Sequence, residues 1–164
     1  MKRFLGCLAT LALAFSASAA SAAPASLDND PIGALIGQAI TSALQQAAPD
    51  FLLKATLYHA GEPGMSARDS LGCKVVAMRT AAVDGRRVPR HTVLFIKQTV
   101  GLPMPGGGVS DGFWYASDLG SAIHAGRIDL FTGQGAASMV PLLSLNLATL
   151  SVVDAGTFAG CPPR

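Results

Sequence analysis

The stretch Asp118–Phe131, with the sequence DLGSAIHAGRIDLF, contains the features that decide the fold and the chemistry. Asp129 stands between Ile128 and Leu130, in an apolar run that favours a β-strand. Successive side chains of a strand point to opposite faces, so Asp129 faces away from these two neighbours. Because burying an unpaired carboxylate is costly, we expect Asp129 to face water, a partner or a cleft. Partial burial near a second carboxylate would raise its pKa, as a general acid near neutral pH requires.

Short β-prone runs alternate with Gly and Pro on both sides of this stretch, from Phe51 to the C-terminus. No helical pattern alternates with these runs, which argues against a parallel βαβ fold. We therefore predict a mainly β domain, arranged as a small barrel. The candidate strands are Leu52–His59, Lys74–Arg79, Thr92–Lys97, Gly112–Ala116, Ile128–Phe131 and Leu150–Asp154. The apolar segment Pro141–Leu147 fits either a short helix or a strand.

One amphipathic helix is expected before the β region. Asp30 and Pro31 form a typical helix start, and Pro49 ends the pattern. Apolar residues recur at helical spacing over 31–48. We expect this apolar face to pack on the barrel, with a stalk or an oligomer contact as alternatives.

The N-terminus has the three-part pattern of a secretory signal peptide. Lys2 and Arg3 are followed by the uncharged apolar run Phe4–Phe15 and then by Ala and Ser up to Pro24. The apolar run is too short for a permanent membrane anchor. We predict an exported protein, periplasmic or secreted, with a signal peptide over 1–23, a linker and helix over 24–50 and the β domain over 51–164.

Charge and cysteine content agree with export. Removal of Lys2 and Arg3 reduces the 12 basic residues to ten, against 10 acidic ones, so the charge offers no case for nucleic-acid binding. Cys7 leaves with the signal peptide. Cys73 and Cys161 remain as an even pair in an oxidising compartment, which predicts one disulfide. Two cysteines and scattered histidines do not make a zinc site, so we expect no metal and no cofactor.

Two segments together resemble the 3D (three-aspartate) domain family, related to MltA-type lytic transglycosylases and small stationary-phase muralytic proteins. The family motif runs Asp-Thr/Val-Gly-Gly-Ala-Ile-Lys-Gly, then three residues, then Asp. The matching positions are Asp118, Gly120, Ala122, Ile123 and Asp129. Upstream, Ala82-Val83-Asp84, Val88-Pro89 and the strand from His91 resemble a second family motif. The resemblance covers about Lys74 to Gly135.

The resemblance implies a six-stranded double-psi β-barrel with Asp84, Asp118 and Asp129 lining one groove. It also implies non-hydrolytic cleavage of the β-1,4 bond between N-acetylmuramic acid (MurNAc) and N-acetylglucosamine (GlcNAc) in peptidoglycan, which leaves 1,6-anhydro ends. By position, Asp129 matches the catalytic acid. Asp118 would orient the site and support positive charge on the sugar, and Asp84 would hold the hydrogen-bond network. Taken without the resemblance, Asp84-Gly85 is a typical turn.

The sequence departs from the motif at several positions. Ser121 and Ala125 replace glycines, and His124 stands where Lys is common. Upstream, His91 also replaces a glycine. Ser121 and His124 are candidates for sugar binding, although a surface histidine without such a role is the commoner outcome. Trp114 is a candidate stacking platform, with a position in the core as an equal alternative.

Two other functions remain open from the sequence. A barrel of this kind can bind cell-wall glycan without cleaving it, because a fold does not determine function. The helix over 31–48 can also join a partner. The retention of all three aspartates favours the enzyme.

Overall fold

A computed structural model describes residues 30–120 and 122–164. The signal peptide predicted over 1–23 and the candidate sugar ligand Ser121 lie outside the described residues. The structure is mainly β, as predicted. Its helices are α1 (Pro31–Gln46) and the 3₁₀ helices η2 (Lys97–Thr99) and η3 (Ala136–Leu145). Its strands are β1 (Phe51–Ala60), β2 (Thr80–Val83), β3 (Thr92–Ile96), β4 (Phe113–Leu119), β5 (Arg127–Gln134) and β6 (Thr149–Thr157).

The six strands pair in a closed ring, in the order β1-β5-β2-β4-β3-β6 and back to β1. The pairs β1–β5 and β2–β4 are parallel, and the other four are antiparallel. β1, β3, β4, β5 and β6 overlap predicted strands, whereas the prediction of a strand over Lys74–Arg79 is wrong. Met78 has a left-handed φ of 53°, which interrupts an extended chain there, and the strand begins at Thr80 instead.

The core lies inside the ring and follows the alternation of the strands. Leu53, Ala55 and Leu57 point inward from β1, and Ile128 and Leu130 point inward from β5. The segment predicted over Pro141–Leu147 as helix or strand is mostly 3₁₀ helix, and η3 buries Leu142 in the same core. The residues between the inward ones point outward, and these outer positions carry the candidate site.

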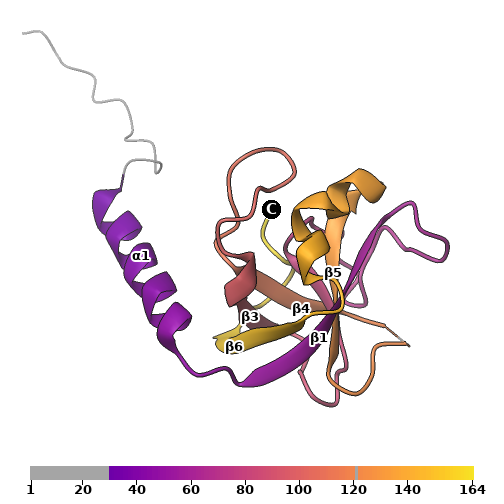
Figure 1. Cartoon of the computed structure of the whole chain (residues 1–164), viewed down its shortest axis with the longest axis horizontal. Helices are drawn as coiled ribbons and strands as arrows, with labels where there is room; N and C mark the ends of the chain where they lie inside the picture. The colour runs from indigo at the N-terminus through magenta and orange to yellow at the C-terminus, as the bar shows by residue number, and fades with distance from the viewer. Residues whose placement is uncertain (1–29, 121) are drawn as a thin grey trace, which may run out of the picture.

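The helix α1 forms as predicted but does not pack on the ring. Asp30 caps it, with the Ile32 amide donating to Asp30 Oδ1 at 3.1 Å. None of its residues is buried, and Ile32 and Leu35 are 67% and 65% exposed. Figure 1 shows α1 to one side of the strands. The expected packing is therefore wrong, because a short connection directs the chain from α1 away from the core and into β1.

Lys97 forms polar contacts with the C-terminal end of α1. Lys97 Nζ donates to Gln45 O at 2.9 Å and also to Ala47 O. In the described part of the chain, no helix combines the length and the apolar character needed to span a membrane.

The predicted disulfide is confirmed. Cys73 and Cys161 are bonded, with Cα atoms 5.5 Å apart and a sequence separation of 88. The bond joins the long connection between β1 and β2 to the C-terminal segment. This connection also contributes to the candidate site, so the disulfide anchors one of its walls.

Candidate active site on the outer face of the ring

Asp118 and Asp129 lie on the same outer face, on either side of Ala82. Ala82 on β2 pairs with Asp129 on β5 and with Asp118 on β4. Residues in register on neighbouring strands point to the same face. Two strand spacings of about 4.8 Å place the two Cα atoms about 10 Å apart. Because Ala82 has only a methyl group, little side chain separates the two carboxylates.

A β-bulge directs Asp118 to this face. Ala81 pairs with Ala116, but the next residue, Ala82, pairs with Asp118, so Ser117 is an extra residue on β4. Ala116 points into the core, and regular alternation would direct Asp118 inward as well. The extra residue reverses that direction, as bulges do near functional sites.

Asp129 is partly buried and incompletely hydrogen-bonded. Its Oδ1 atom is covered and has no hydrogen-bond partner in the described chain. Burial raises the pKa of Asp129, and the charges of Glu62 and Asp118 raise it further, while hydrogen bonding from the Thr56 hydroxyl opposes them. Thr56 lies opposite Asp129 in the β1–β5 register. A carboxyl group with a raised pKa keeps its proton to higher pH, which suits proton donation.

Asp118 is held in place by backbone donors. The amide groups of Ser70 and Leu119 donate to Asp118 Oδ1 at 3.0 and 2.8 Å. Ser70 belongs to the connection between β1 and β2, and its hydroxyl donates to Ser117 O at 3.2 Å. These bonds orient the carboxylate without neutralising its charge, so Asp118 can stabilise positive charge near it.

Tyr58 lies near the two carboxylates, although no sequence motif indicates it. It lies on the outer side of β1, opposite Phe131, and the two ring centroids are 5.2 Å apart. Its hydroxyl is buried and lacks a hydrogen-bond partner among the described residues. Burial raises the pKa of Tyr58, and the charges of Asp118 and Asp129 add to this effect. Only knowledge of the β1–β5 pairing would have placed this tyrosine beside the carboxylates.

Asp84 directly follows β2 and begins a turn. Its Oδ1 accepts hydrogen bonds from Arg86 N at 3.1 Å and from Arg86 Nε at 3.2 Å. The backbone bond is the main reason that the pKa of Asp84 is lowered. Asp84 lines a hollow of about 380 Å³ together with His124, apart from Asp118 and Asp129. The carboxylate therefore performs the turn role that Asp-Gly indicated, close to the end of the strand that carries Ala82.

The other predicted sugar contacts have different outcomes. His124 is exposed and faces the hollow of Asp84. Trp114 is 0% exposed, and its indole N–H donates to Thr99 Oγ1 at 3.0 Å inside the ring. The prediction that Trp114 stacks on sugar is therefore wrong, because alternation along β4 directs this side chain into the core.

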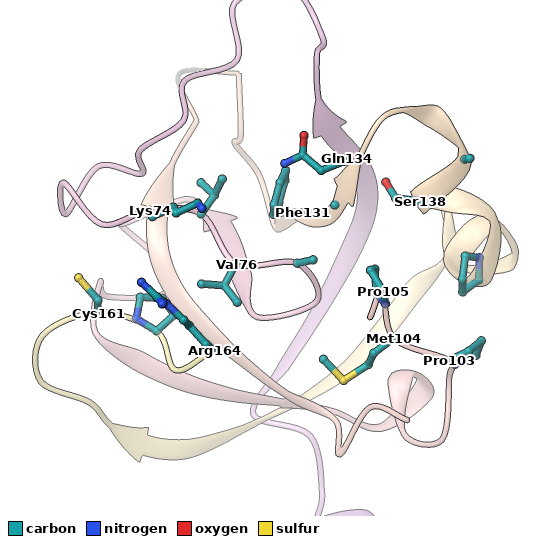
Figure 2. Close-up of a pocket in the computed structure, with 16 residues that line it drawn as sticks. Lys74, Val76, Pro103, Met104, Pro105, Phe131, Gln134, Ser138, Cys161 and Arg164 are labelled. Carbon is teal, nitrogen blue, oxygen red and sulfur yellow. The ribbon is translucent and has the colours of Figure 1, made fainter. Parts of the chain in front are cut away.

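A larger cavity of about 650 Å³ lies further along β5. Figure 2 shows its lining residues, which include Phe131 but none of the three aspartates. No group of three or more His, Cys, Asp or Glu residues able to hold a metal ion occurs in the ranges 30–120 and 122–164. The outer face thus holds a carboxylate pair, and the cavity is a separate recess near it.

One comparison with known families agrees with the aspartate motifs. A family model described as the 3D domain matches residues 79–140. No curated protein matches the chain by sequence. Among solved structures, the chain is similar to the lytic transglycosylase MltA of Escherichia coli, with 18% identity and a TM-score of 0.37 over 58% of this chain and 30% of that one. An MltA variant in an apo form gives 18% identity and a TM-score of 0.38, with the same coverage.

The lytic transglycosylase LtgG of Burkholderia pseudomallei is similar at 24% identity and a TM-score of 0.35, over 56% of this chain and 29% of that one. The chain thus spans less than a third of the length of these solved proteins. The matched segment 79–140 includes Asp84, Asp118 and Asp129. The 3D-domain model thus matches the segment in which the two aspartate motifs lie.

Proposed function

We propose that the chain is a lytic transglycosylase that cleaves the β-1,4 bond between MurNAc and GlcNAc in peptidoglycan and leaves 1,6-anhydro ends. The observation that carries this proposal is the pairing of Asp118 and Asp129 on one face across Ala82. The raised pKa of Asp129 adds support, because it fits a general acid. The 3D-domain match over 79–140 covers both residues.

In this proposal Asp129 acts first as acid and then as base. Protonated Asp129 donates its proton to the glycosidic oxygen, and the bond from that oxygen to C1 of MurNAc breaks. The 6-hydroxyl oxygen of the same sugar bonds to C1, and its proton returns to Asp129. The nucleophile is tethered to the reacting carbon, so no second carboxylate is needed to activate water.

The remaining acids have supporting roles. Asp118, fixed by the Ser70 and Leu119 amides, stabilises the positive charge that develops on the sugar ring. Asp84 stabilises the turn after β2 by accepting a hydrogen bond from Arg86 N. This turn supports the hollow that Asp84 and His124 line. We assign His124, and Ser121 in the preceding segment, to sugar binding.

The proposal also includes the type of barrel, the export of the protein and its partner. The two parallel pairs β1–β5 and β2–β4 support a double-psi barrel over 51–164. Peptidoglycan lies outside the cytoplasm, so the proposal includes export with removal of residues 1–23. The partner is then peptidoglycan glycan, without nucleic acid or a permanent membrane anchor.

Substitution of Asp129 tests the proposal. Asp129→Asn keeps the shape of the side chain but removes the proton donor. We expect the variant to fold normally and to release 1,6-anhydro products from cell-wall sacculi at least about 100-fold more slowly than the wild type. Mass analysis of the soluble products measures both their amount and their anhydro ends.

Asp154→Asn is the matched control, because Asp154 is an exposed strand aspartate on β6, away from β2 and β5 in the ring. We expect it to retain wild-type release. Equal release by wild type and Asp129→Asn, with both proteins folded, would contradict the proposal.

A glycan-binding module without cleavage is the second candidate. The engagement of Asp84 with Arg86, apart from the other two acids, favours it. This alternative predicts that the wild-type protein sediments with sacculi while no soluble glycan is released. Binding with release of anhydro products would exclude it.

A further inference from the structure

The cavity of about 650 Å³ has two chemically distinct sides. Lys74 and Arg164 line one side, whereas Met104 and neighbouring prolines line the other, with Val76 between them (Figure 2). No Asp or Glu side chain is among the lining residues. Within the described residues, neither Lys74 nor Arg164 forms a salt bridge. Such a cavity suits a ligand that is both apolar and anionic.

The cavity adjoins the carboxylate face along β5. Phe131 lines the cavity and lies two residues after Asp129 on the same side of the strand, about 7 Å further along. Its ring contacts Tyr58. The charges of Asp118 and Asp129 contribute to the raised pKa of Tyr58, so Tyr58 lies near both carboxylates. A ligand bound at the carboxylate pair can therefore extend past Phe131 into the cavity.

The connection between β1 and β2 is a second link between the carboxylate face and the cavity. Ser70 in this connection holds Asp118, and Lys74, four residues later, lines the cavity. The disulfide at Cys73 stands between them and fixes this part of the connection to the C-terminal segment that carries Arg164. The cationic side of the cavity is thus fixed relative to Asp118.

We propose that this cavity binds the peptide stem attached to the lactyl group of MurNAc, on the sugar whose bond is cleaved. The inference rests on the proposed function, because it assigns the substituent of the same substrate. A stem of alanine and glutamate residues supplies methyl groups for the apolar wall and carboxylates for Lys74 and Arg164. Glycan stripped of peptide keeps only the methyl and carboxylate of the lactyl group beside the sugar ring, and it lacks the stem that would extend to the two cations. The enzyme therefore prefers strands that still carry their peptides.

A binding experiment tests the cavity without reference to cleavage. The probe is N-lactoyl-L-alanyl-γ-D-glutamate, titrated into the protein and followed by the methyl NMR signals of Met104 and Val76. We expect saturable shifts, a Kd at least about tenfold higher for Lys74→Gln and for Arg164→Gln, and a similar loss when the probe's carboxylates are amidated. Lys97→Gln is the matched control, because Lys97 contacts α1 and does not line the cavity, and its Kd should not change. Absence of saturable shifts, or an equal Kd for Lys74→Gln and Lys97→Gln, would overturn the assignment.

A cleavage experiment separates this inference from the proposed function. Anhydro-product release is measured on intact strands and on strands stripped of peptide by an amidase. We expect Lys74→Gln to lower kcat/KM at least about tenfold on intact strands and to leave the rate on stripped strands unchanged. A protein that binds the probe at the cavity but cleaves neither substrate would refute the proposed activity and retain the peptide site. A protein that cleaves both substrates equally well would retain the activity and refute the peptide site.

Discussion

Asp129 shows how a single residue takes its chemistry from its surroundings. An aspartate in water is ionised at neutral pH, but Asp129 has a covered oxygen without a partner and a neighbouring Asp118. Both conditions disfavour the charged form and raise its pKa. Two consequences follow, one for activity and one for stability.

The pH profile of the reaction should show the raised pKa of Asp129. Proton donation requires the protonated acid, so activity should fall as the pH rises through this pKa, which lies above the ordinary value of 3.8.

The folded protein is also less stable once Asp129 ionises, because its folded pKa exceeds the unfolded one. Asp129→Asn should therefore be more stable than the wild type at neutral pH, and the difference should vanish below pH of about 4. Urea unfolding across this range measures it, and a difference independent of pH would contradict the explanation.

Backbone strain is a second effect at the residue scale. Ala125 has a φ of 54° and His91 a φ of 70°, and both stand where the 3D-domain motifs have glycine. The left-handed region costs a residue with a Cβ about 1 kcal/mol, whereas glycine adopts it freely. The left-handed backbone at these two positions thus explains why the motifs have glycine there.

Replacement of Ala125 by glycine should release that strain. We expect Ala125→Gly to raise the free energy of unfolding by about 1 kcal/mol, measured by urea denaturation. Ala137→Gly is the matched control, because Ala137 is exposed within η3 and is not among the described residues with positive φ, and it should destabilise by about 0.5–1 kcal/mol. If both changes destabilise equally, strain at Ala125 is not significant.

At the scale of elements, α1 and η3 show that apolar content does not decide packing. Both have apolar side chains, yet α1 buries none of its residues, whereas η3 places Leu142 in the core between strands. The difference arises from the connections, because η3 follows β5 directly and is held over β1 and β5.

The same substitution in the two helices should therefore have different effects. Leu142→Ala leaves a cavity in the core and should lower the free energy of unfolding by about 2–5 kcal/mol. Leu35→Ala, at a side chain that is 65% exposed, should change it by no more than about 0.5 kcal/mol. Thermal and urea unfolding of the two variants measure the contrast, and a comparable loss for Leu35→Ala would show that α1 does contribute to the folded ring.

At the scale of the whole molecule, closure of the ring and the disulfide act together. β6, near the end of the chain, pairs with both β1 and β3, so the ring closes only when distant parts of the sequence meet. The Cys73–Cys161 bond lowers the conformational entropy of the unfolded chain, because the segment between the two cysteines remains a closed loop. It also holds the connection whose Ser70 binds Asp118.

Removal of the disulfide should affect stability and the site together. We expect the Cys73→Ser, Cys161→Ser double variant to lose about 2–4 kcal/mol of unfolding free energy. Because Ser70 is then held less firmly, anhydro-product release should fall more than the folded fraction alone explains. Reduction of the wild-type protein should reproduce the stability loss, and an unchanged midpoint of unfolding in both cases would contradict this role.

Local patterns in the sequence determined most of the elements and the resemblance to a family. Alternation and turn residues predicted five of the strands, the Asp-Pro start predicted α1, and the even cysteine pair predicted the disulfide. The aspartate motifs resemble those of the 3D domain, whose family model matches residues 79–140. Each of these signals depends on residues near one another in the chain or on a simple count, so no knowledge of the tertiary structure was needed.

Only the tertiary structure decided which residues share a face. Alternation shows that neighbouring side chains of β4 point to opposite faces, but it does not show which face is the core. The core and a sugar platform were therefore equal alternatives for Trp114 until the ring placed it in the core. The register of β2 with β4 and β5 brings Asp118 and Asp129 around Ala82 and depends on a bulge at Ser117. Tyr58 joins them through a strand from the other end of the domain. Register depends on which face each strand buries and on the turns between strands, and both are known only once the strands of the ring are paired.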